Sequence, residues 1–321
     1  MLRRLLPFAV AALVAAPVAL ADGGSAPPGL QGGAGVLGPG GGVRYVAVGS
    51  GSNTVVQEMK QGSVSRWRSI AGSWGIPSVA FDGSTGGVSR DGYTLVLAPT
   101  QGGYPLRRRS SFLLLSTATF RSMGRVSLNG DFSYDALSPD GSKLYLIQHV
   151  SKRDLNRYVV RAYDLDLNRL LPGRIADRTQ RGWVMAGWPL TRATSADGRW
   201  VYTLYARPDG YPFVHALDAV RGVAHCIGIP WRGKMDAIWR LRMSVRDGGR
   251  TLSLHWRSGR EYLAVARGTW RISHPSSLRT GSGSSFPWWT VGLGTALGAA
   301  LLLGAVRLKG RYGFRARAAT N

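Results

Sequence analysis

The chain has 321 residues, 44% of them apolar, which is long enough to bury a sizeable core in one large domain or two smaller ones. Its formal net charge of +24 is typical of nucleic-acid-binding proteins, but the export and membrane signals described next separate the chain from cytoplasmic nucleic acid, so no such partner is predicted. The single cysteine, Cys226, excludes an intramolecular disulfide, and we expect a buried, unreactive thiol there.

The N-terminus has the pattern of an export signal. Arg3 and Arg4 precede an apolar run that ends in the small-x-small sequence at 19–21. We predict a secretory signal peptide over residues 1–21, followed by a Gly/Pro-rich linker over 22–35. The arginine pair is also a feature of twin-arginine export signals, but its surroundings favour the general secretory route.

The C-terminus has the pattern of a membrane anchor. Residues 288–306 carry no charge, and at ~1.5 Å per residue such a helix spans roughly the hydrocarbon core of a bilayer. A Gly/Ser-rich linker over 274–287 precedes this run and a basic tail over 307–321 follows it, which favours a transmembrane helix over a buried core helix. The positive-inside rule then predicts a cytoplasmic C-terminus and an ectodomain outside the cytoplasmic membrane. Gly294 and Gly298 have the GxxxG spacing of helix dimers, although small residues are also common in transmembrane helices that do not dimerise.

Between these ends, a short turn motif recurs. It has the form Ser-x-Asp-Gly at 89–92, 138–141 and 195–198, with a variant lacking Ser at 245–248 and a degenerate glycine-rich copy at 38–41. Asp accepts hydrogen bonds from nearby backbone amides and Gly tolerates positive φ, so each copy predicts a tight turn between two antiparallel strands.

The spacing of the turns predicts the fold class. The intervals from Gly40 through Asp91, Asp140 and Asp197 to Asp247 are 51, 49, 57 and 50 residues. Repeats of this length without an apolar helical face are typical of β-propeller blades, so we predict an all-β ectodomain over 36–273 with five four-stranded blades. The layout is clearest in the second full copy, with strands expected at 134–138, 143–149, 157–163 and 169–175.

Two stretches, Leu137-Ser138-Pro139-Asp140-Gly141-Ser142-Lys143-Leu144-Tyr145-Leu146 and Val160-Arg161-Ala162-Tyr163-Asp164-Leu165, resemble extracytoplasmic β-propellers with YVTN or TolB-type (WD40-like) repeats. The resemblance covers roughly residues 36–272. It implies a fold and no particular activity.

The first strand of a blade normally lines the central channel, and equivalent positions there are candidates for a site. Five residues before each turn Asp lie Gly86, Asp135, Arg192 and Arg242. Arg192 and Arg242 are suited to bidentate binding of a carboxylate or phosphate, with Asp135 orienting one of them. The alternative is an internal salt bridge that closes the channel.

A second candidate is a basic face. The loops between the second and third strands of the blades are rich in cations, among them Arg107, Arg108 and Arg109, and lie at the end of each sheet from which the chain leaves for the membrane. Such a face is suited to anionic lipid or an anionic cell-wall polymer. The alternative is a solvated arginine rim without a partner.

Motifs for enzyme chemistry are weak. The five histidines are scattered, no metal-ligand spacing occurs, and no metal or cofactor is predicted. We therefore expect a membrane-tethered propeller that acts as a binding or scaffold module for an envelope component or a partner protein. The alternative is a propeller hydrolase or lyase whose site lies at the channel mouth.

Overall fold

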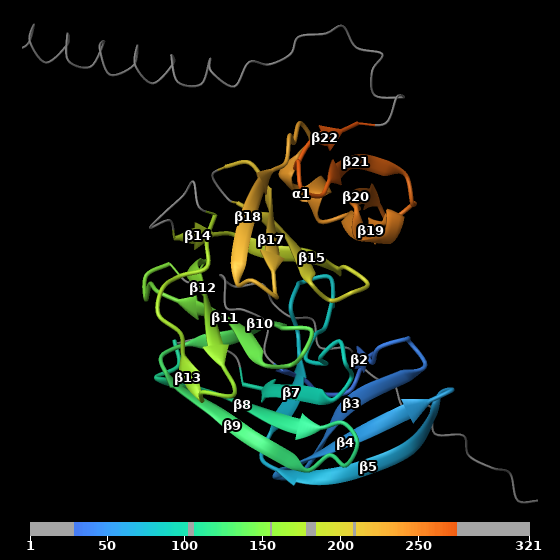
Figure 1. The fold of residues 1–321 in the computed structure, drawn as a ribbon, viewed down its shortest axis with the longest axis vertical. Coiled ribbons are helices and arrows are strands. Elements are labelled where there is room, and N and C mark those ends of the chain that lie inside the picture. Colours follow the sequence, from blue (N-terminus) through green and yellow to red (C-terminus); the bar gives the residue numbers. More distant parts are fainter. Residues whose placement is uncertain (1–28, 102–105, 155, 178–183, 208–209, 275–321) are drawn as a thin grey trace, which may run out of the picture. The chain divides into compact units, whose positions relative to one another are not determined.

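The computed structural model describes residues 29–101, 106–154, 156–177, 184–207 and 210–274. These residues form an all-β unit of five antiparallel sheets that follow one another along the chain (Figure 1). The predicted signal peptide and the predicted transmembrane segment at 288–306 lie outside the described residues. Within the described part, no helix has the length and apolarity needed to cross a membrane.

The strands are assigned to sheets 1 to 5 in chain order. Sheet 1 contains β2 (Val36–Leu37), β3 (Val43–Ser50), β4 (Asn53–Lys60) and β5 (Ser63–Ala71). Sheet 2 contains β1 (Gly29–Leu30), β6 (Trp74–Pro77), β7 (Thr94–Pro99), β8 (Arg109–Ser116) and β9 (Ser122–Asn129). Sheet 3 contains β10 (Phe132–Leu137), β11 (Lys143–His149), β12 (Arg157–Asp164), β13 (Arg169–Leu170) and β14 (Met185–Ala186). Sheet 4 contains β15 (Trp188–Thr194), β16 (Trp200–Ala206), β17 (Phe213–Asp218) and β18 (Val223–Gly228). Sheet 5 contains β19 (Leu241–Arg246), β20 (Thr251–Trp256), β21 (Glu261–Ala266) and β22 (Ile272–Ser273), and two short helical turns are α1 (Met235–Ile238) and η2 (Asp247–Gly249).

The predicted meander of four strands per repeat is confirmed. Sheets 1, 4 and 5 each have four strands in sequence order, and the predicted strand at 143–149 coincides with β11. Sheets 2 and 3 differ from the prediction, and sheet 3 has a fifth strand, β14, paired with β12. The last strand of sheet 3 is short, with only Arg169–Leu170 in β13 and an isolated bridge between Ile175 and Val160 beyond it. Sheet 2 also contains β1, which precedes sheet 1 in the sequence and pairs with β6, the strand that follows sheet 1.

The Ser-x-Asp-Gly turns are held by their own side chains. In the turn between β15 and β16, the Ser195 hydroxyl donates to Asp197 at 2.5 Å and accepts the Trp200 N–H at 2.8 Å, while Gly198 has a φ of +72°. The hydrogen bond from Ser195 lowers the pKa of Asp197. The variant copy without Ser lacks this brace, and the chain there forms the 3-10 turn η2 instead.

The hydrophobic core is divided among the interfaces between successive sheets. Four clusters of buried residues join sheet 1 to 2, 2 to 3, 3 to 4 and 4 to 5. Each contains side chains without exposed surface, such as Leu97, Leu146, Tyr145 and Leu254 respectively. The alternation along each strand places neighbouring residues in different clusters, as expected for sheets covered on both faces.

Residues 78–92, between β6 and β7, reach from sheet 2 to other sheets, while 87–89 stay hydrogen bonded to β7; we call residues 78–92 the hub segment. Phe81 and Asp82 donate their backbone N–H groups to the carbonyl oxygens of Pro189 and Leu190, at 2.9 and 3.1 Å. The hub segment is therefore hydrogen bonded to β15, the first strand of sheet 4.

The same two residues contact sheet 5 and the residues that lead into it. The ring of Phe81 lies 5.9 Å from the ring of Trp239. The Asp82 carboxylate lies 3.7 Å from Nε of Arg242 in β19. A single turn of the hub segment thus connects sheet 2 to sheets 4 and 5, which come much later in the sequence.

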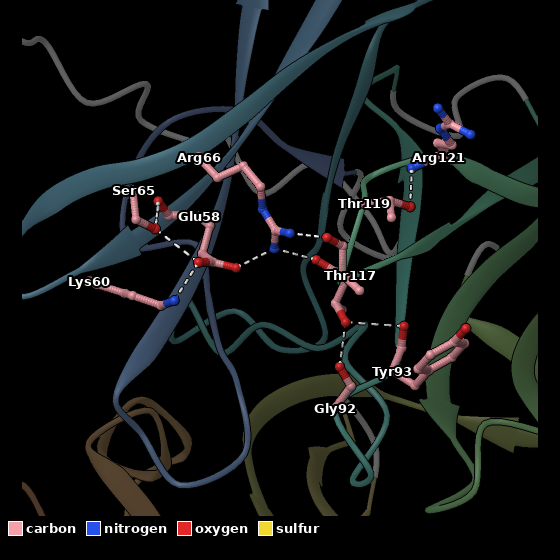
Figure 2. A network of polar contacts seen from close by, with 10 residues as sticks. Glu58, Lys60, Ser65, Arg66, Gly92, Tyr93, Thr117, Thr119 and Arg121 are labelled. Carbon is pink, nitrogen blue, oxygen red and sulfur yellow. Dashed lines mark hydrogen bonds and ion pairs between the residues drawn. The ribbon is translucent and has the colours of Figure 1, made fainter.

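Sheets 1 and 2 are tied together by an arginine (Figure 2). Arg66 in β5 contacts Glu58 in β4 at 2.5 Å and donates to the carbonyl oxygen of Thr117, in the turn between β8 and β9, at 2.6 Å. The Thr117 hydroxyl in turn donates to Gly92 at 2.6 Å, and Lys60 contacts Glu58 at 2.9 Å. Burial opposes ionisation of Glu58, but its hydrogen bonds and the neighbouring cations outweigh that effect and lower its pKa.

Candidate functional site

A cavity of about 510 Å³ lies where the hub segment meets the inner strands of the sheets. Its walls come from β2 and the turn after it, the hub segment, β10, β15 and the turn before β16. The charged residues that line it are Arg90, Asp135 and Arg192. Its volume falls within the range of small-molecule binding sites.

Asp135 and Arg192 form a buried ion pair in this cavity. Only 3% and 8% of their side-chain surfaces are exposed. One Nη of Arg192 contacts the Asp135 carboxylate, the other donates to the Asp135 carbonyl oxygen, and Nε donates to the Thr203 hydroxyl at 3.0 Å. Within the described residues the second carboxylate oxygen of Asp135, Oδ2, accepts no hydrogen bond, and Asp135 lines the cavity.

A local irregularity of the strand positions the carboxylate. The register of β10 against β11 shifts between Tyr134 and Ala136, which makes Asp135 the extra residue of a β-bulge. Bulges redirect side chains and bend the strand. The neighbouring hydroxyl of Tyr134 accepts the N–H of Gly87 at 3.0 Å, which fixes the hub segment against this bulge.

A row of polar side chains continues from Arg192 across sheet 4. Arg192 pairs with Thr203, Thr203 with His215, and His215 with Cys226 in the strand register. Residues paired directly across antiparallel strands share one face of the sheet. The row therefore runs from the cavity through the interface between sheets 3 and 4.

At neutral pH, His215 and Cys226 at the far end of this row are both uncharged. Burial lowers the pKa of His215 to about 4, so its imidazole is neutral. Burial also raises the pKa of Cys226 to about 12, which keeps the thiol protonated. The Cys226 sulfur lies 3.8 Å from Nδ1 of His215, whereas His215 Nε2 has no hydrogen-bond partner among the described residues.

Arg90 is the free cation at the cavity wall. It is exposed, has no ion pair within the described ranges, and its side chain lies against Gly198, where an added Cβ would come within 2.9 Å of the Arg90 Cβ. Strand β15 contributes Thr194 to the cavity wall, and the Thr194 hydroxyl has no hydrogen-bond partner among the described residues. The wall thus offers one unneutralised positive charge beside the neutralised pair.

Of the four equivalent inner positions, three line the cavity. Gly86, Asp135 and Arg192 are brought together, whereas Arg242 is not part of the lining. Nη1 of Arg242 donates instead to the carbonyl oxygen of Trp239 at 3.0 Å, and its Nε faces Asp82. The internal salt bridge that the sequence offered as an alternative is therefore present at Asp135, and Arg242 has a structural contact of its own.

The three consecutive loop arginines have different environments. Arg107 contacts the buried Asp131 at 2.7 Å and the carbonyl oxygen of Phe132 at 2.6 Å, with 17% of its side chain exposed. Arg108 and Arg109 are exposed. Burial opposes ionisation of Asp131, yet His149 and Arg107 outweigh it and lower its pKa. Binding of an anionic surface by Arg107, Arg108 and Arg109 stays a prediction, and Arg107 also holds the fold.

Two residues of the site were not identified from the sequence. Arg90 lies inside the first Ser-x-Asp-Gly turn, at a position where the other two copies have Pro139 and Ala196. An arginine at a turn position that is uncharged in the other copies could have marked Arg90 as a candidate site residue. His215 had no local signal, because only the strand register places it in the row with Arg192.

The arrangement favours binding over proton transfer. The bonding partner of Asp135 is a guanidinium rather than a histidine or a second carboxylate, and a carboxylate so paired is a poor general base. His225 contacts Asp177 at 2.8 Å and stacks on Trp270, away from the cavity lining. Among the described residues, no group of three His, Cys, Asp or Glu side chains is placed to hold a metal ion.

Comparisons with known proteins inform the fold alone. No protein-family model matches the sequence, and no curated protein matches it either. Structural neighbours are β-propellers. The propeller domain of Cps50 (Swd1) from Myceliophteria thermophila has 12% identity and a TM-score of 0.42, covering 84% of this chain and 69% of that one.

Two bacterial structures are similar to the same degree. BamB from Moraxella catarrhalis has 16% identity and a TM-score of 0.41, covering 74% of this chain and 62% of that one. A putative TolB from Agrobacterium tumefaciens has 13% identity and a TM-score of 0.39, covering 78% and 79%. At such values the likeness concerns the arrangement of strands and not the ligands of these proteins.

Proposed function

We propose that the protein is a binding or scaffold module that uses the cavity lined by Arg90, Asp135 and Arg192 to hold an envelope component or a segment of a partner protein. The observation that carries this proposal is the cavity itself, into which a β-bulge directs the buried pair of Asp135 and Arg192 beside the free Arg90. A buried, oriented polar pair in a concave site fixes the orientation of a ligand.

The charges define the ligand class. Arg192 is neutralised by Asp135, so the unneutralised charge of the wall belongs to Arg90. The open acceptor of Asp135 requires a donor such as a hydroxyl or amide N–H. A ligand that carries a carboxylate or phosphate together with a hydroxyl or amide group matches both requirements.

Membrane tethering is part of the proposal. It rests on the uncharged run at 288–306, the basic residues after it and the export signal at the N-terminus. In this arrangement the sheets lie outside the cytoplasmic membrane and the tail over 307–321 lies inside. Extraction of membranes with alkaline carbonate tests it, because a spanning chain stays in the pellet and a peripheral one is released.

The cavity is tested by ligand binding to the full chain. Fragments of envelope polymers that carry a carboxylate or a phosphate are titrated into wild type, Arg90→Gln and, as a matched control, Arg121→Gln, an exposed arginine outside the cavity lining. We expect Arg90→Gln to weaken binding by about tenfold, the scale of one charge-assisted hydrogen bond, and Arg121→Gln to have no effect. Equal affinity in all three proteins, or no binding by any fragment, would contradict the proposal.

A further inference from the structure

The segment between β18 and β19, residues 229–240, is fastened to the end of sheet 5 by aromatic contacts. Trp231 packs against Tyr262 and Trp256, with ring centroids 5.2 and 6.0 Å away. The Tyr262 hydroxyl donates to the Pro230 carbonyl oxygen at 2.5 Å, and Trp231 Nε1 donates to the Lys234 carbonyl oxygen at 3.3 Å. The segment is thus held in one position relative to the sheet.

This rigid base presents two large apolar side chains to solvent. Met235 is 37% exposed, and Trp239, whose ring packs on one side against Phe81, is 41% exposed. Figure 1 shows the helical turn α1, which carries Met235, beside the orange strands of sheet 5. Arg242 donates to the Trp239 carbonyl oxygen at 3.0 Å, which fixes the segment at its far end.

Exposed cations accompany these apolar side chains in the same segment and in the turn between β20 and β21. None has an ion pair within the described residues, and they are Arg232, Lys234, Arg240, Arg257 and Arg260. The nearby carboxylate of Glu261 is neutralised by Arg246, which leaves Asp236 as the one acidic residue of the segment. We call these five cations with Met235 and Trp239 the basic-aromatic patch.

The patch lies at the end of sheet 5 toward which its last strand, β22, runs. Leu241 of β19 pairs with Trp256 of β20, and β22 runs antiparallel to β21, so at Ser273 the chain heads toward the end that carries the patch. The following residues up to the uncharged run are few enough to reach only ~20 Å as a random coil. A membrane that held residues 288–306 would therefore be within reach of the patch.

We infer that the basic-aromatic patch docks on an anionic membrane surface, with Trp239 and Met235 at the level of the headgroups. Tryptophan beside arginine and lysine is the chemistry of membrane interfaces, and each cation near an anionic surface adds to the attraction. This inference rests on the proposed tether, and it identifies the side of the domain that faces the lipid.

The test uses the full chain in lipid nanodiscs of neutral or anionic composition. An environment-sensitive dye is attached to Met235→Cys in a Cys226→Ala background, and the control position is Val64→Cys, because Val64 in β5 is also an exposed apolar residue at 46%. We expect a brighter dye at position 235 in anionic discs than in neutral discs, loss of that difference in high salt, and no change at position 64.

Charge variants sharpen the test. The triple variant Arg232→Gln/Lys234→Gln/Arg240→Gln should lower the ratio of docked to free protein by on the order of 100-fold, from ~1 kcal/mol per cation and ~1.4 kcal/mol per factor of ten. The control variant Arg68→Gln/Arg121→Gln/Arg169→Gln removes three exposed cations elsewhere and should leave docking unchanged.

Several results would overturn the inference. They are equal brightness in both discs, an equal effect of the two triple variants, brightening at position 64 instead of 235, or an equal response to soluble polyglutamate, which would indicate a polyanion site. If alkaline carbonate releases the chain from membranes, the proposed tether is wrong. The dye measurement is then repeated with anionic vesicles added to the released chain, and an unchanged dye signal at position 235 would overturn the docking inference as well.

Discussion

Acidification should destabilise the protein through His215. This histidine is 2% exposed, and burial lowers its pKa to about 4, against about 6.5 in an unfolded chain. Between these two values the unfolded state binds the proton that the folded state excludes, so the free energy of unfolding falls as the pH falls. From pH 7.5 to 5.0 the linkage relation gives a loss of about 2 kcal/mol from this group alone.

The assay is urea unfolding followed by tryptophan fluorescence at the two pH values. His215→Gln removes the titrating group, so its stability should fall by about 2 kcal/mol less than that of wild type over the same interval. Tyr202→Phe changes a buried side chain on the same sheet without changing a histidine, and should retain the wild-type loss. If His215→Gln loses as much stability as wild type, His215 is not buried in its neutral form and the reasoning fails.

Three further predictions concern stability at neutral pH, measured by the same unfolding assay. Arg192→Leu leaves the Asp135 carboxylate buried and unpaired and should cost about 3–5 kcal/mol, whereas adding Asp135→Leu should recover much of that loss; no recovery would mean that the two residues do not act as a pair. Arg66→Met removes the tie between Glu58 and the neighbouring sheet and should cost about 2 kcal/mol, and a cost near zero would show that solvent replaces it. Ser195→Ala removes the hydroxyl that braces the turn and should lower the free energy of unfolding by about 1 kcal/mol. A loss too small to measure would show that the hydroxyl does not stabilise the turn.

Local chemistry made the repeat pattern predictable. The Ser-x-Asp-Gly turns specify their own geometry, because the Ser195 hydroxyl and the Asp197 carboxylate bind amides within the same turn. The β1–β6 pairing is different, since it depends on two glycines far apart in sequence. An added Cβ at Gly75 would lie 2.3 Å from the Gly29 carbonyl carbon, so the close approach exists only because both residues lack side chains.

The sequence indicates which residues lie at the candidate site but not which groups they bind. Equivalent positions in successive repeats identified Asp135 and Arg192, but whether they bind each other or a ligand depends on the distance between two sheets. The sequence places Arg107 on a basic face with Arg108 and Arg109, and does not indicate its partner Asp131, which lies in the connection to the next sheet. Arg242 lies instead beside Asp82, a contact between segments far apart in the sequence that the repeat spacing does not indicate.

The hub segment also bears on how the domain folds and unfolds. In a linear array of sheets, each unit contacts only its neighbours, and the array can fray from its ends. Here Phe81 and Asp82 are bonded to Pro189 and Leu190, so sheet 4 cannot detach without breaking contacts made by the first third of the chain. Such long-range closure slows folding but makes unfolding cooperative. As the chain is synthesised, the turn at Phe81 and Asp82 must wait until Pro189 and Leu190 have been made before its hydrogen bonds can form.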